Sequence, residues 1–202
     1  MPMFVLNYAA NQRGCPLVLR GAINTGWTWG AFNPDLSVGR PSQGYVYQSK
    51  HHFLDFDYWN ECEMASERFV EICGRFGVGF EPVAVDVLLS NRMSSEKKYF
   101  YLRWSAWASI IDLERSDYEL ERELETGEVA YHKYFPDVPV LATVENFVVD
   151  ESRLPASAAF KCLDLGHALV CNAEFREACE QAGLVGIQFD DITTYKKADF
   201  WG

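Results

Sequence analysis

Basic side chains are scarce in this sequence. Its 202 residues include 18 Lys and Arg against 29 Asp and Glu, which gives a formal net charge of −11. A protein that binds nucleic acid needs a basic face to displace the counterions on phosphates. The charge therefore argues against a nucleic-acid partner, and it suits either solubility or a partner protein that is itself basic.

Long apolar runs are also absent. No stretch approaches the roughly 20 apolar residues of a membrane-spanning helix. The first apolar run extends only from Met3 to Leu6, and no Lys or Arg precedes it as in a secretory signal peptide. We therefore expect a cytoplasmic protein with no membrane partner, in which the segment Met3–Leu6 forms an edge strand.

Motifs for common enzyme chemistry are missing. The chain has no G-x-G-x-x-G fingerprint, no phosphate-binding loop and no G-x-S-x-G nucleophile elbow. None of its cysteines forms a C-x-x-C pair, so neither a zinc ribbon nor a redox motif is indicated. The sequence predicts a protein that is not an enzyme and uses no cofactor or metal. We expect reduced, mostly buried thiols at Cys15, Cys62, Cys73, Cys162, Cys171 and Cys179.

Two other classes of protein remain as alternatives. The segment HHFLDFD (residues 51–57) offers mixed nitrogen and oxygen ligands for a metal, although neighbouring side chains of a strand point to opposite faces. His167 is close in sequence to Cys162 and Cys171, and a thiol–imidazole pair can act as a nucleophile. The first alternative is therefore a small thiol- or metal-dependent hydrolase. The second is a structural subunit, which would expose a large apolar patch.

An internal repeat is the most informative pattern. Segments 66–83 and 172–192 each place apolar residues at positions i, i+3, i+4 and i+7, which form one stripe on a short amphipathic helix. The stripes are Phe69, Ile72, Cys73 and Phe76 in the first segment, and Phe175, Ala178, Cys179 and Ala182 in the second.

The ends of the two predicted helices also correspond. Ser66 and Asn172 occupy the N-cap position, where a side-chain oxygen accepts a hydrogen bond from a free backbone N–H. Gly77 and Gly183 follow the helices, where a left-handed residue ends a helix at little cost. A strand is predicted after each helix. We interpret the pattern as one helix–strand unit used twice, and a unit this short must pack on a sheet.

Strand patterns dominate the rest of the chain. Strands are expected at residues 83–89, 99–104, 144–149, 160–163 and 168–171, with a hairpin turn between the last two. Many strands with a few short helices predict an α+β fold with mainly antiparallel sheet, which contains the duplicated helix–strand unit.

The chain is expected to form one compact unit with two parts. The first forty-odd residues are rich in Gly, Asn, Pro and Trp, and we predict that residues 1–57 form a variable N-terminal part docked on the core by aromatic side chains such as Trp27 and Trp29. Residues 58–202 are predicted to form the α+β domain itself.

One segment, residues 112–128, is strongly acidic. Only Arg115 and Arg122 oppose its negative charges. Such a run is either a solvated surface or a contact for a basic partner. The candidate partner-binding residues are Asp112, Glu114, Asp117, Glu119, Glu121, Glu123, Glu125 and Glu128.

A short helix is predicted within the acidic run. Ser116 followed by Glu119 has the spacing of a capping box. Leu120 and Leu124 would then lie on the inner face of the helix, and Gly127 would end it.

Several stretches resemble an immunity protein family of bacterial polymorphic toxin systems, the one numbered eleven and formerly catalogued as a domain of unknown function. The similarity runs from Tyr58 to Ile192, and the chain departs from the family at Arg103-Trp104, where Asn is usual, and at Asn172, where Ser is common. The matching stretches are residues 66–69, 83–85, 99–102, 111–116, 147–150, 160–163 and 171–189.

The resemblance implies an antidote that binds a cognate toxin protein in the producing cell and neutralises it. It implies no catalytic residue. If the toxin is a nuclease its active cleft is basic, and the acidic run would be steered to that cleft by its charge.

Overall fold

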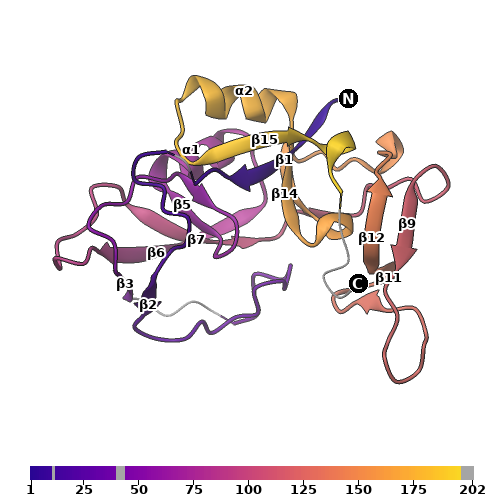
Figure 1. Cartoon of the computed structure of the whole chain (residues 1–202), viewed down its shortest axis with the longest axis horizontal. Helices are drawn as coiled ribbons and strands as arrows, with labels where there is room; N and C mark the ends of the chain where they lie inside the picture. Colours follow the sequence, from indigo (N-terminus) through magenta and orange to yellow (C-terminus); the bar gives the residue numbers. More distant parts are fainter. Residues whose placement is uncertain (11, 40–43, 197–202) are drawn as a thin grey trace.

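Two main sheets, two small two-stranded sheets and two short α-helices make up the described part of the fold (Figure 1). The computed structural model describes residues 1–10, 12–39 and 44–196. The first sheet contains, in order, β15 (Ile187–Asp191), β1 (Met3–Tyr8), β14 (Ala168–Asn172), β13 (Ala159–Cys162) and β8 (Trp107–Ala108). The second sheet contains β2 (Gly21–Ile23), β3 (Tyr45–Ser49), β6 (Phe80–Leu88), β7 (Tyr99–Trp104), β5 (Met64–Ser66) and β4 (Tyr58–Trp59).

Most neighbouring strands run antiparallel, and only the β13–β8 and β3–β6 pairs of the described chain are parallel. This arrangement confirms the predicted α+β class. The predicted strands at residues 83–89, 99–104, 160–163 and 168–171 correspond to β6, β7, β13 and β14.

Strand β1 lies inside the first sheet. It pairs with β14 on one side and with β15 on the other, so the prediction of an edge strand is wrong. Phe4 and Leu6 pack into one core cluster, while Met3 and Val5 pack into another on the opposite face. A strand that is covered on both faces is apolar throughout, which explains the unbroken run in the sequence. The division of the chain at residue 57 stays a prediction.

The two predicted helices are present and are capped as expected. They are α1 (Glu67–Arg75) and α2 (Ala173–Gln181). The backbone N–H of Phe69 donates to Ser66 Oγ at 3.3 Å, and the N–H of Phe175 donates to Asn172 Oδ1 at 2.9 Å. Gly77 and Gly183 follow the helices with φ of 60° and 63°. Left-handed residues of this kind satisfy the last carbonyl groups of a helix.

Each helix connects two strands in the same way. Strands β5 and β6 flank α1 in sequence and lie on either side of β7 in the second sheet. Strands β14 and β15 flank α2 and lie on either side of β1 in the first sheet. Both units are therefore strand–helix–strand units with one antiparallel strand inserted. The predicted repeat is confirmed and is larger by the preceding strand.

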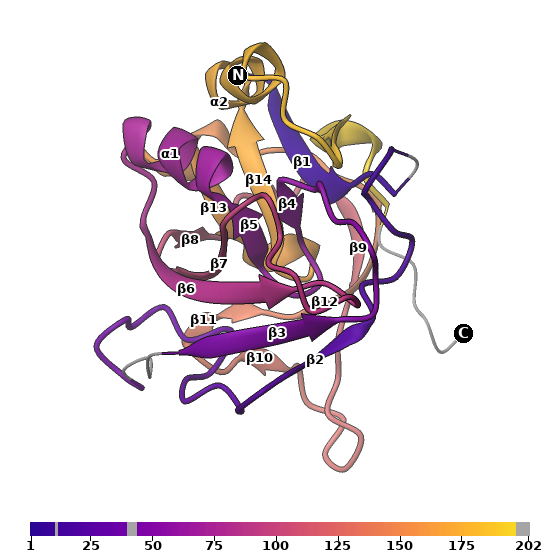
Figure 2. The same ribbon diagram turned by 90° about the vertical axis from the view of Figure 1, so that its left-hand side faces the viewer.

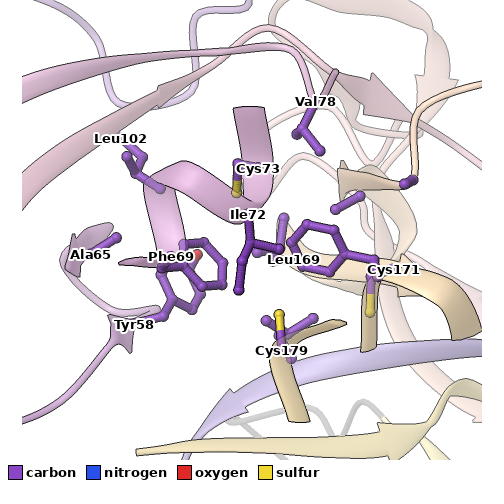
Figure 3. Close-up of a cluster of buried hydrophobic side chains, with 14 of the residues drawn as sticks. Tyr58, Ala65, Phe69, Ile72, Cys73, Val78, Leu102, Leu169, Cys171 and Cys179 are labelled. Carbon is purple, nitrogen blue, oxygen red and sulfur yellow. The ribbon is translucent and has the colours of Figure 1, made fainter. Parts of the chain in front are cut away.

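The helices cover a shared core. Figure 3 shows side chains of α1 and α2 converging with those of β14 in one buried cluster. Phe69 and Phe175 are fully buried there, with ring centroids 6.0 Å apart, and Cys73 and Cys179 fill the space beside them. Burying one such large side chain contributes about 1.5–3 kcal/mol to folding.

Four further strands form a small lobe at one end of the molecule. They are β9 (Asp117–Leu120), β10 (Tyr131–His132), β11 (Phe135–Pro139) and β12 (Leu141–Asn146). Strand β12 pairs with β9, and β10 pairs with β11 (Figures 1 and 2). The predicted strand at residues 144–149 is thus displaced toward the N-terminus. Leu141 and Val144 bury the inner face of this lobe.

Among the described residues, the structure contains no helix that is both long and apolar enough to cross a membrane.

Candidate functional site

The acidic run forms a β-hairpin, and the predicted helix is wrong. Strand β9 pairs with β12, and the chain then turns back between Arg122 and Val129, which form an isolated bridge. Across the turn, the N–H of Glu123 donates to the carbonyl of Glu128 at 2.9 Å. Ser116 does not cap a helix, because its hydroxyl accepts a hydrogen bond from Val148 N at 3.0 Å. We call residues 117–130 the acidic hairpin.

The alternation of side chains explains why this segment is a strand. In β9 the acidic residues Asp117 and Glu119 are exposed, while Tyr118 and Leu120 are partly buried against the core. This period of two suits a strand with one solvated face. Strand β12 pairs with β9 and continues the same two-faced sheet. In the sequence it lies after the turn.

Most of the predicted partner-binding carboxylates reach solvent. Asp112 is the exception, because its side chain is 19% exposed and pairs with Arg115 Nε at 2.6 Å. That hydrogen bond lowers the pKa of Asp112, and the charge of this carboxylate is therefore engaged in the local turn with Arg115. The exposed carboxylates are Glu114, Asp117, Glu119, Glu121, Glu123, Glu125 and Glu128.

Exposed apolar side chains accompany this charge. Leu124 at the tip of the acidic hairpin is 104% exposed, so its predicted place on an inner face is wrong. Gly127 lies in the turn with φ of 71°, where it closes the hairpin and not a helix. Tyr131 directly follows the hairpin and is 55% exposed. Both views show the hairpin extending from the body of the molecule (Figures 1 and 2).

In the structure, His167 does not form a thiol–imidazole pair with Cys162 or Cys171. Its ring packs 4.5 Å from the ring of Phe32, and its Nε2 lies 3.4 Å from Nδ1 of His132. The thiol of Cys162 lies 3.7 Å from the carboxylate of Asp164. Cys171 belongs to the core beneath the helices. Burial raises the pKa of both thiols, which favours the protonated form over the nucleophilic thiolate.

The residues of the HHFLDFD segment are engaged in separate structural contacts. His51 Nε2 lies 3.1 Å from a backbone carbonyl, and His52 Nδ1 lies 2.7 Å from Ser90 Oγ. Asp55 and Asp57 both bind Lys97, at 2.7 and 2.9 Å. Across the ranges that the structure describes, no group of three or more His, Cys, Asp and Glu is arranged to hold a metal ion.

All six cysteines are free thiols, and five of them are buried, which confirms that part of the prediction.

One feature was not predicted from the sequence, a cavity of about 430 Å³ on the second sheet. Its lining includes the rings of Trp27, Tyr47, Trp59 and Tyr101. These rings come from a loop and three different strands, so no local sequence motif predicts the cavity. The only signal in the sequence is the aromatic content of 15%.

Comparison with known proteins places this fold in a family. No curated protein matches the chain. Residues 33–194 match the Immunity protein family (Imm11), which is well over half of the chain and includes both strand–helix–strand units. The match begins within the predicted N-terminal part, and so it extends further toward the N-terminus than the resemblance that starts at Tyr58. The chain therefore belongs to the Immunity protein family (Imm11).

Proposed function

We propose that the protein is an antitoxin of a bacterial polymorphic toxin system, which binds and neutralises a cognate toxin protein in the cytoplasm of the producing cell. Membership of the Immunity protein family (Imm11) is the observation that supports this function most strongly. Binding would neutralise the toxin by covering its active site, and it requires no catalytic residue or cofactor in the antitoxin.

We further propose that the acidic hairpin is part of the toxin-binding surface. It combines exposed carboxylates with the fully exposed side chain of Leu124 and the half-exposed ring of Tyr131. Interfaces commonly consist of a few apolar or aromatic anchors within a polar rim. An acidic surface of this kind suits a basic toxin, such as a nuclease, because complementary charge accelerates association.

A binding experiment tests the function. The toxin domain encoded beside this protein should form a stable complex with it, measured by surface plasmon resonance on an inactive toxin variant. An absence of binding to that domain would contradict the proposed pairing.

A charge-reversal experiment tests the surface separately. Glu119, Glu121 and Glu125 are exposed, and their joint replacement by Lys should lower the association rate constant at least about tenfold and weaken its dependence on salt.

The matched control reverses three exposed carboxylates elsewhere, Glu71, Glu96 and Glu177. It changes the net charge equally but should alter association far less. Equal effects of the two triple variants would show that the association rate depends on the net charge of the protein and that the hairpin has no special role.

A further inference from the structure

The cavity on the second sheet has the size of a small-molecule site. Its volume of about 430 Å³ lies within the roughly 300–1,000 Å³ typical of such sites. The floor contains Trp59 and Tyr101, which are 2% and 6% exposed. Exposed residues such as Val18 and Glu61 also line it, so the cavity opens to solvent.

Aromatic rings are held in place around this space. The rings of Trp27 and Tyr101 lie 4.4 Å apart, and Trp59 stacks on Tyr8 at 4.0 Å. The hydroxyl of Tyr47 donates to a backbone carbonyl at 3.3 Å. Because these contacts fix the rings before any ligand arrives, little ordering is needed on binding.

The charge of the lining favours a cation. Glu61 contributes a carboxylate, and no Lys or Arg is among the described residues that line the cavity. The neighbouring thiol of Cys62 remains neutral, because burial raises its pKa to about 12. An aromatic wall with a single carboxylate attracts ammonium groups through the negative faces of the rings and through direct charge.

We propose that this cavity binds a small organic cation with a methylated ammonium head, which packs against the aromatic lining, chiefly the partly exposed rings of Trp27 and Tyr47, and pairs with Glu61. This activity goes beyond neutralisation of a toxin. It uses none of the residues of the acidic hairpin, so each proposal can fail without the other.

Titration with choline tests the proposal, with 3,3-dimethyl-1-butanol as the uncharged molecule of the same shape. Intrinsic fluorescence reports binding, because Trp27 and Trp59 line the cavity; calorimetry gives an independent affinity. Choline should bind saturably and at least about tenfold more tightly than the neutral alcohol. An absence of saturable choline binding, or equal binding of the two compounds, would overturn the proposal.

Two variants locate the binding. Trp27→Leu removes a ring and should weaken choline binding about 2- to 30-fold. Glu61→Gln removes the only carboxylate of the described lining and should weaken choline binding while leaving the alcohol unaffected. Glu96→Gln removes an exposed carboxylate outside the cavity and is the matched control. If Glu61→Gln behaves like this control in choline binding, the proposed recognition of charge is wrong.

Discussion

Glu63 joins the two sheets through a cluster of buried polar contacts. Its carboxylate accepts hydrogen bonds from the hydroxyl of Tyr58 at 2.8 Å and from the indole N–H of Trp104 at 2.7 Å. Lys161 of the other sheet binds it at 2.6 Å, and the Lys161 side chain is only 3% exposed. A buried ion pair of this kind adds little stability compared with apolar residues in place of both partners. Removing one partner alone is costly, because the other charge is then buried without a counter-charge.

Replacement of Lys161 by Met should therefore lower the free energy of unfolding by about 3 kcal/mol, because the Glu63 carboxylate loses its counter-charge. Urea denaturation measures the change. Lys98→Met is the control, since the pair of Lys98 with Glu67 is exposed, and its effect should stay below about 1 kcal/mol. A small effect of Lys161→Met would show that the two hydrogen bonds from Tyr58 and Trp104 suffice.

The thiols give a second prediction at the scale of single residues. Burial raises the pKa of all six cysteines, Cys15, Cys62, Cys73, Cys162, Cys171 and Cys179. A raised pKa means that the folded state binds the proton more tightly than the unfolded state does. The stabilisation is complete below the unfolded pKa of about 8.5 and is lost as the pH rises above it.

We therefore expect the free energy of unfolding to fall between pH 8 and pH 9.5, below the ordinary pKa values of Lys and Tyr. Urea denaturation at intervals across this range measures it. Stability that is constant or increases with pH would contradict the assignment of buried, protonated thiols.

At the scale of elements, the two helix caps are alike in sequence position but unequal in their surroundings. Asn172 accepts one hydrogen bond from Phe175 N. Ser66 accepts the equivalent bond, and its hydroxyl also donates to the buried carboxylate of Asp57 at 2.5 Å. The same Asp57 accepts from Val185 N, after α2, so it connects both strand–helix–strand units.

Asn172→Ala should cost about 1 kcal/mol of stability, as expected for one lost N-cap. Ser66→Ala should cost more, about 2–3 kcal/mol, because it also removes a donor from a buried carboxylate. Thermal or urea unfolding of the two variants gives the comparison. Equal losses would mean that the contact between Ser66 and Asp57 adds nothing to the cap.

These elements also show what could be predicted from the sequence. The helices α1 and α2 were predicted correctly, because caps, apolar stripes and terminal glycines all lie within one short segment. The acidic hairpin was predicted wrongly as a helix, because β12, which pairs with β9, is separated from it by the whole turn and two further strands. The position of β1 inside a sheet likewise depends on strands near the other end of the chain.

At the scale of the whole molecule, the two proposed binding sites lie on different elements. The acidic hairpin extends from the small lobe (Figure 1), whereas the aromatic cavity lies on the second sheet. The sequence alone identified the acidic residues but not their arrangement. The cavity could not be predicted, because its lining residues become neighbours only through long-range pairing.

The central claim is that this member of the Immunity protein family (Imm11) protects a cell from a cognate toxin through the acidic hairpin. Survival of cells that co-express the neighbouring toxin tests it most directly. The wild-type protein and the Glu71, Glu96 and Glu177 control should both protect. The variant with Lys at Glu119, Glu121 and Glu125, expressed at an equal level, should protect at least about tenfold fewer cells, as the slower association predicts. Full protection by that variant would contradict the role of the hairpin, and cell death with the wild-type protein would contradict the proposed function.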